Sequence, residues 1–160
     1  MLIKAGKRIV HWMWEICARA FSQGKVPDDW KGSIIIPLYK GKGNKRECKN
    51  SRGISILSVA GKVYGSILIE RARRINDKMI GDEQGGFGSG RGCVDQIFAM
   101  RQLIEKCGRK GKKVFAAFID LEKAYDRIDR DGLWKVLEIY GVDGNLLERL
   151  KVFTQVAEHV

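Results

Sequence analysis

An aspartate at the end of an apolar run is the first candidate for chemistry. Residues 114–119 (VFAAFI) are almost all apolar, and Asp120 and the residues LEKAYD follow them. Such a run is typical of a strand buried on both faces, which would place Asp120 at the strand's exit. A carboxylate there can hold Mg²⁺ against a phosphate. The other interpretation, that Asp120 only caps the turn, is favoured by these residues taken alone.

A cationic segment lies in the first third of the chain. Residues 40–52 contain one acidic residue, Glu47, and six basic ones: Lys40, Lys42, Lys45, Arg46, Lys49 and Arg52. A cationic loop between two strands is suited to closing on a triphosphate, because it neutralises charge that shifts during phosphoryl transfer. A solvated basic hairpin is the alternative interpretation, and it is common for charge runs.

Five glycines between Gly85 and Gly92 predict a loop that turns sharply or brings its backbone close to a ligand. Their spacing does not fit the dinucleotide-binding pattern GxGxxG, and no Gly-Lys pair is followed by Ser or Thr, which excludes a P-loop. The two histidines, His11 and His159, lie near opposite ends and have no neighbouring ligand pattern, so neither is assigned to catalysis or metal.

Charge is unevenly distributed along the 160 residues. Lysine and arginine number 30 against 19 acidic residues, a net charge of +11, and 24 of the basic residues but only 10 of the acidic ones precede Asp120. A cationic body beside an acidic end is expected of a protein that binds a polyanion. A basic surface that only aids solubility explains the charge equally well.

Composition sets the class of protein. A hydrophobic content of 44% is enough for one domain with a core. The apolar stretches are too short to cross a membrane. Four widely spaced cysteines suggest reduced thiols, so we expect an intracellular protein, in the nucleus or the cytoplasm.

Periodicity predicts the elements that position these residues. Apolar residues at helical spacing predict five helices, over residues 7–21, 59–75, 94–107, 133–140 and 146–156. Short β-branched runs predict strands at 33–39 and 54–57, and Pro37 places the first at a sheet edge or a bulge. With the buried strand at 114–120, the sequence indicates an α+β fold.

Four blocks resemble, in the right order, the reverse transcriptase domain of non-LTR (LINE-type) retrotransposons: IIIPLYKGKG, SRGISILSVAGKVYGSIL, EQGGFGSGRGCVDQIF and FAAFIDLEKAYDRIDRDGLW. The resemblance extends from about Trp30 to Tyr140. It implies a partial right-hand polymerase fold with a fingers region, the first palm strand and the helices that follow. The implied organisation is a helical lead-in (1–29), a fingers-like region (30–113) and an incomplete palm (114–160).

The resemblance also implies roles in the palm. Asp120 matches the first metal-binding aspartate, and the backbone carbonyl of Leu121 matches the neighbouring ligand of Mg²⁺. Tyr125 matches the aromatic residue under the sugar of the incoming nucleotide, where a ring leaves no room for a 2′-hydroxyl. Read without the family, Tyr125 is a core aromatic.

In the fingers, the resemblance makes Lys40 and Arg52 the expected contacts of the triphosphate. Gln84, Gly86 and Phe87 resemble the template-side loop, and Arg91 resembles a backbone contact. A plain glycine turn is the alternative. The implied partners are an RNA template, a DNA primer and a deoxynucleoside triphosphate.

A palm of this kind also needs the paired aspartates of a YxDD hairpin. The single Asp-Asp pair of these residues, Asp28–Asp29, precedes the first strand and has no tyrosine two positions before it. We therefore expect the 160 residues to be inactive alone. A non-enzymatic remnant that binds nucleic acid is the second hypothesis. A chain that associates or aggregates through an exposed edge strand is the third.

Overall fold

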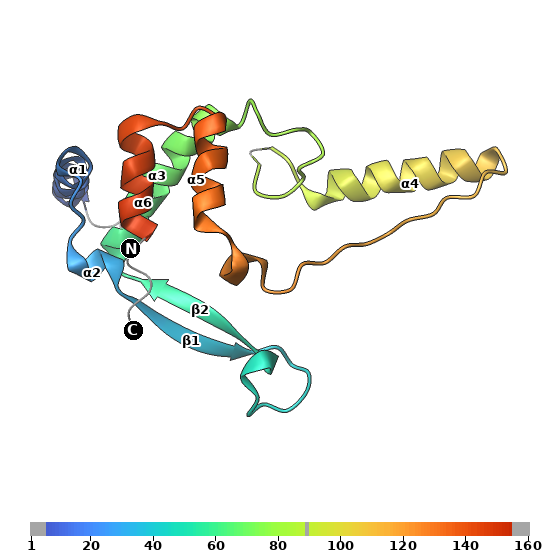
Figure 1. Cartoon of the computed structure of the whole chain (residues 1–160), viewed down its shortest axis with the longest axis horizontal. Helices are drawn as coiled ribbons and strands as arrows, with labels where there is room; N and C mark the ends of the chain where they lie inside the picture. Colours follow the sequence, from blue (N-terminus) through green and yellow to red (C-terminus); the bar gives the residue numbers. More distant parts are fainter. Residues whose placement is uncertain (1–5, 89, 155–160) are drawn as a thin grey trace. The chain divides into compact units, whose positions relative to one another are not determined.

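The computed structural model describes residues 6–88 and 90–154, which form helices and a two-stranded antiparallel sheet (Figure 1). The predicted helix over 146–156 therefore extends beyond the described residues. In chain order the elements are α1 (Gly6–Gln23), α2 (Asp28–Lys31), β1 (Ser33–Tyr39), η2 (Cys48–Asn50), β2 (Ser51–Leu57), α3 (Val59–Asn76), α4 (Cys93–Arg109), η3 (Ala124–Arg127), α5 (Arg130–Ile139) and α6 (Gly144–Thr154). This mixture is the α+β class expected from the sequence.

The chain divides into two compact units, which are described separately. The first comprises Met1–Arg73 and Val142–Val160, and the second comprises Arg74–Gly141. The predicted division at residues 29 and 113 is a different kind of boundary, drawn from the resemblance rather than from packing. Among the described residues, no helix has the length and apolarity that a membrane crossing requires.

The core of the first unit is built on α3. Tyr64 and Leu68, one helical turn apart, are 1% and 0% exposed. The ring of Tyr64 lies between Trp30, with centroids 5.5 Å apart, and Phe153 of α6, at 5.7 Å in an edge-on arrangement. The apolar side of α1 contributes Cys17 to the same cluster. The helical spacing of apolar residues thus identified real core positions.

The end of α1 is fixed by a distant arginine. Gly24, just past the helix, has φ +68°, a conformation that glycine adopts without strain. Arg149 of α6 donates from Nε to the carbonyl of Phe21 (2.6 Å) and from Nη2 to that of Ser22 (3.4 Å). These bonds satisfy carbonyl groups that have no partner within the helix.

The sheet is an antiparallel hairpin of β1 and β2. Its register runs from Ser33 opposite Leu57 to Tyr39 opposite Ser51. Pro37 lies opposite Gly53, and because both strands of a two-stranded sheet are edges, the missing N–H of proline removes little. The expected strands are confirmed, although β2 begins three residues before the predicted start at Ile54.

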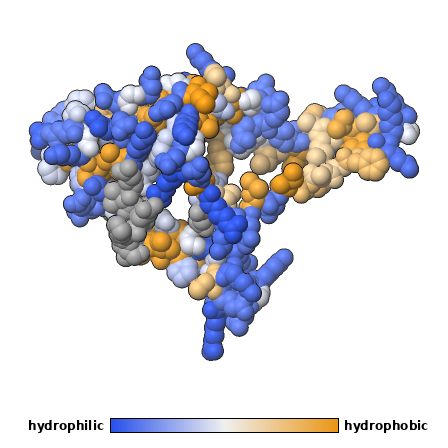
Figure 2. All heavy atoms as spheres, viewed as in Figure 1, coloured by the Kyte–Doolittle hydropathy of each residue, from blue (hydrophilic) through white to orange (hydrophobic). Residues whose placement is uncertain are grey.

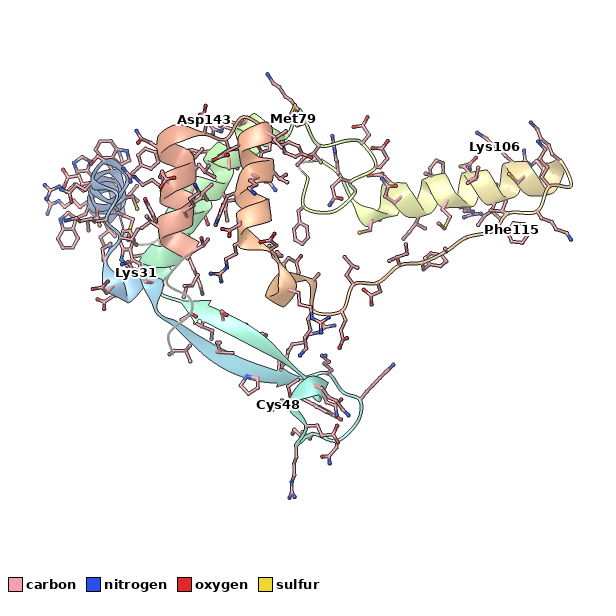
Figure 3. All side chains as sticks on the ribbon, viewed as in Figure 1. Lys31, Cys48, Met79, Lys106, Phe115 and Asp143 are labelled. Atoms are coloured by element: carbon pink, nitrogen blue, oxygen red, sulfur yellow. The ribbon has the colours of Figure 1, made fainter. Side chains whose placement is uncertain are left out.

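In the second unit the predicted strand at 114–120 is wrong. The segment from Lys112 to Leu121 has no regular structure and is exposed, with Phe115 92% and Phe118 83% accessible. Figure 3 shows Phe115 on this segment. A strand requires a hydrogen-bonded neighbour, and in the described part of the chain β1 and β2 pair only with each other.

Helix α4 has the predicted position but not a buried face. Phe98 is 62% exposed, and other apolar residues along the helix are similarly accessible: Val94, Ile97, Leu103 and Ile104. Hydrophobic colour covers this part of the surface in Figure 2. The spacing of apolar residues predicts the amphipathic helix correctly, but it does not indicate which surface the apolar side packs against.

Candidate functional site

The turn between β1 and β2 brings Lys40 and Arg52 to the same end of the hairpin. The backbone N–H of Lys40 donates to the carbonyl of Asn50 (2.8 Å), and Arg52 lies two positions further along, opposite Leu38. The ammonium of Lys40 donates to the carbonyl of Lys49 (2.9 Å). Arg52 is exposed, and among the described residues no hydrogen bond or ion pair holds its guanidinium. Of these two cations, Lys40 is therefore held by the turn and Arg52 is not.

Side chains of the turn hold its shape. The hydroxyl of Tyr39 donates to the backbone carbonyl of Gly43 (2.6 Å). The side-chain amide of Asn50 donates to the backbone carbonyl of Asn44 (2.8 Å). Gly43 has φ +80°. Figure 3 marks the position of this turn by Cys48. These bonds connect residues across the turn and hold its path.

Tyr39 and the two asparagines were missed as positioning residues. Their one signal in the sequence is composition, because asparagine and glycine are common where side chains close turns. The same turn also reduces its own charge. Lys49 forms an ion pair with Glu47 at 2.9 Å, while Lys45 lies over the ring of Tyr39 at 6.0 Å from its centroid. Such exposed contacts are individually weak.

The glycine loop of the second unit contains Gln84, Gly86, Phe87 and Arg91. The amide of Gln84 donates to the carbonyl of Gly86 (3.2 Å). Phe87 is 83% exposed and has φ +61°, which is uncommon for a residue with a side chain. Arg91 bonds to its own loop, through the carbonyl of Gly81 (2.6 Å) and the carboxylate of Asp82 (3.0 Å). The predicted loop is confirmed as a loop, and its template role stays a prediction.

The segment with Asp120 is also exposed. Asp120 and Leu121 lie in the irregular stretch before η3, and Tyr125, within η3, is 77% accessible. The core position that the residues alone suggested for Tyr125 is therefore wrong. Lys123, with φ +51°, turns the chain into η3.

Asp120 and Leu121 do not by themselves form a complete magnesium site. Mg²⁺ requires six oxygen ligands in near-octahedral geometry. One carboxylate and one backbone carbonyl supply part of that set. The described residues contain no group of three or more side chains of the metal-binding types that could hold a metal ion. Asp120 and Leu121 can therefore supply only part of the ligand set of a magnesium site.

Burial shifts the pKa of two side chains in the core of the first unit, Cys17 and Tyr64. Burial raises the pKa of the Cys17 thiol above its ordinary value of 9.0. Burial also raises the pKa of the Tyr64 hydroxyl above 10.0, with Arg149 acting weakly in the opposite direction. Both groups are held in their neutral forms, so neither is an activated nucleophile.

The candidate residues belong to both units. Lys40 and Arg52 are in the first, and the glycine loop, Asp120, Leu121 and Tyr125 are in the second. Lys40 and Arg52 lie on one hairpin of the first unit. In the second unit the glycine loop and the segment 120–125 are two separate stretches of chain. We expect from the family that the two sets form one site. No distance within either unit tests this expectation.

Comparison with known proteins gives consistent results. A family model described as "Reverse transcriptase (RNA-dependent DNA polymerase)" matches residues 40–158. The chain is 29% identical to the Transposon TX1 uncharacterized 149 kDa protein of Xenopus laevis, over 89% of this chain and 11% of that protein. It is 32% identical to the putative 115 kDa protein in type-1 retrotransposable element R1DM of Drosophila melanogaster, over 70% of this chain and 11% of that protein.

A third relative is the probable RNA-directed DNA polymerase from transposon BS of Drosophila melanogaster, 29% identical over 81% of this chain and 15% of that protein. The chain thus spans only 11–15% of the length of these relatives. No solved structure gives a significant match. The family match covers most of the chain, and its relatives come from transposable elements. The chain therefore belongs to the reverse transcriptase family, in its non-LTR retrotransposon branch.

Proposed function

We propose that this chain is a nucleotide- and template-binding part of an RNA-directed DNA polymerase of right-hand architecture. The observation that carries the proposal is the hairpin turn, where Lys40 and Arg52 lie at one end of β1 and β2 and Arg52 has no partner among the described residues. A guanidinium that is exposed and not paired can form charge-assisted hydrogen bonds with a triphosphate.

The other residues take the roles that the family implies. Asp120 and the carbonyl of Leu121 contribute ligands to a Mg²⁺ site, and Mg²⁺ supplies charge neutralisation at phosphate oxygens when bound. Tyr125 contacts the sugar of the nucleotide, and its exposure leaves the ring accessible for this contact. Gln84, Gly86 and Phe87 face the template.

These 160 residues alone do not catalyse polymerisation in this proposal. Asp120 is the only aspartate that matches a metal-binding position of the palm, because the Asp28–Asp29 pair begins α2 and not a hairpin turn. Primer extension with Mg²⁺ and deoxynucleotides should therefore be absent. Extension that is lost in Asp120→Asn would contradict this expectation.

A second function is a non-enzymatic nucleic-acid-binding remnant. The excess of basic residues before Asp120 favours it, since unspecific binding to RNA requires only cationic surface. The two functions differ in nucleotide binding, because a remnant has no reason to keep a triphosphate site.

The test is binding of a fluorescent deoxynucleoside triphosphate to the full chain with a template–primer duplex, for wild type and Arg52→Ala. Loss of charge-assisted bonds should weaken nucleotide binding about 10- to 100-fold. The matched control is Arg19→Ala, an exposed arginine on α1 outside the turn, which should leave binding unchanged. Absent nucleotide binding, with equal loss of RNA affinity in both variants, would favour the remnant and refute the proposal.

A further inference from the structure

Arg91 closes the glycine loop on itself. Its Nη1 donates to the carbonyls of Gly81 (2.6 Å) and Ile80 (3.3 Å), and its Nη2 donates to Oδ1 of Asp82 (3.0 Å). The side chain is 30% exposed. A planar guanidinium holds several acceptors in one geometry, which a lysine cannot reproduce. The bonds join the two ends of the loop across about ten residues of sequence.

The start of α4 adds to this closure. The amide of Gln96 donates to the carbonyl of Asp82 (3.3 Å), and the carboxylate of Asp95 accepts from the backbone N–H of Gly92 (3.3 Å). A Cβ at Gly85 would lie 2.7 Å from Cγ of Gln96, and one at Gly88 would lie 2.9 Å from Cδ of Arg91. A side chain at either glycine would therefore force Gln96 or Arg91 to shift.

The closed loop carries an aromatic residue in a strained conformation. Phe87 has φ +61° and is 83% exposed. A left-handed backbone at a non-glycine residue persists only where the surroundings enforce it. The bonds of Arg91 to Ile80, Gly81 and Asp82 close the loop that contains Phe87.

We infer that Arg91 is a positioning residue, which locks residues 81–88 so that Phe87 is presented as a stacking surface for a base of single-stranded RNA. This inference rests on the proposed function. It makes Arg91 a clamp, meaning a residue that holds the loop closed, whereas the family resemblance implied a contact with the phosphate backbone of the nucleic acid. Three of its five N–H donors already bond within the loop, one of them to the carboxylate of Asp82. A loop ordered in advance loses less conformational entropy when RNA binds.

The experiment measures the affinity of the full chain for fluorescein-labelled oligouridylate over a series of salt concentrations. Phe87→Ala should weaken binding about 5- to 150-fold, the range of base–aromatic stacking. Arg91→Ala and Arg91→Lys should both weaken RNA binding, because lysine keeps the positive charge but lacks the planar set of N–H donors of the guanidinium. In the Phe87→Ala background, Arg91→Ala should cause no further loss.

Salt dependence separates the clamp from a phosphate contact. A residue that neutralises a phosphate contributes about 0.7 to the slope of log K against log salt for a single strand. The slope should therefore be the same for wild type and Arg91→Ala. A shallower slope in Arg91→Ala, with affinity retained in Arg91→Lys, would overturn the inference. Asp82→Asn gives a second test: it should weaken binding if Arg91 is a clamp, and strengthen it if Arg91 contacts phosphate.

Hydrogen exchange without RNA tests the loop independently of binding. Arg91→Ala should accelerate exchange of the amides of residues 82–88, while Arg101→Ala, which removes an ion pair with Glu105 on α4, should not. Unchanged exchange in Arg91→Ala would refute the clamp. If exchange changes but wild type binds no RNA, the proposed function and the stacking role of Phe87 fail, and only the loop closure stands.

Discussion

Removing one hydroxyl from the core should stabilise the first unit. Tyr64 is 1% exposed, and its ring packs between Trp30 and Phe153. Among the described residues, its hydroxyl has no hydrogen-bond partner. A buried polar group without a partner costs about 1 to 3 kcal/mol, because its bonds to water are lost on folding. Tyr64→Phe keeps the ring contacts and removes this cost.

We expect the free energy of unfolding to rise by about 1 kcal/mol, the lower end of that range, since phenylalanine leaves a small gap. For a chain of this size, that corresponds to an increase in Tm of about 2 to 4 °C. Thermal unfolding followed by far-UV circular dichroism, together with urea denaturation, measures both quantities.

The gain should increase at high pH. Burial raises the pKa of Tyr64 above 10.0, so above that pH the unfolded chain loses its phenolic proton while the folded chain keeps it. The unfolded state then binds fewer protons, and stability falls as pH rises. Phenylalanine cannot ionise, so Tyr64→Phe should lack this part of the alkaline destabilisation.

The control is Tyr125→Phe, which removes a hydroxyl from a side chain that is 77% exposed and should change stability by less than about 0.5 kcal/mol. A loss of about 1 kcal/mol or more in Tyr64→Phe would show that the hydroxyl has a favourable partner. A stability gain that shrinks above pH 10 would refute the ionisation argument.

Three further predictions concern packing and exposure. Leu68→Ala, at a fully buried position, should lower the free energy of unfolding by about 2 to 5 kcal/mol in urea denaturation. Burial raises the pKa of Cys17 above 9.0, so stability should fall as pH rises past 9, and Cys17→Ala should reduce that slope in urea titrations at pH 8 and pH 10. Phe118→Glu should change stability by less than about 0.5 kcal/mol and reduce self-association in sedimentation; a loss of several kcal/mol would show that the segment is buried.

Helices and the hairpin could be predicted because their signals are local. Apolar residues at helical spacing give α1 its position, and Cys17 and Ala20 on that side are buried. The strand Ser33–Tyr39 has the predicted bounds, and Pro37 marks its edge position. Each of these elements has a partner within the described residues, because α1 contributes to the core and β1 pairs with β2.

The segment after α4 could not be predicted because its signal is not local. An apolar run predicts burial, but it does not say what surface covers the run. Phe115 and Phe118 are exposed, and no strand among the described residues pairs with their segment. The apolar face of α4 shows the same mismatch. Sequence therefore predicts which side chains are apolar enough to be buried, and packing partners decide whether they are.

The candidate site shows a corresponding limit. A cationic turn and a glycine loop were predictable from composition, but the bonds of Lys40 to Lys49 and of Arg91 to Gly81 were not. These bonds depend on turn conformations that place a carbonyl near a cation nine or ten residues away. Sequence spacing alone does not specify such a conformation.

Net charge alone could not decide between a surface for solubility and a surface for a polyanion, but the contacts distinguish the basic residues by role. Lys40, Arg91 and Arg149 each donate to backbone carbonyls of turns or helix ends. Such donors hold local structure, so some of their N–H groups are already used within the protein. The excess of basic residues therefore overstates the number of phosphate contacts. The salt dependence of RNA binding counts those contacts directly, so it should reflect only the cations that touch phosphate and not the total charge.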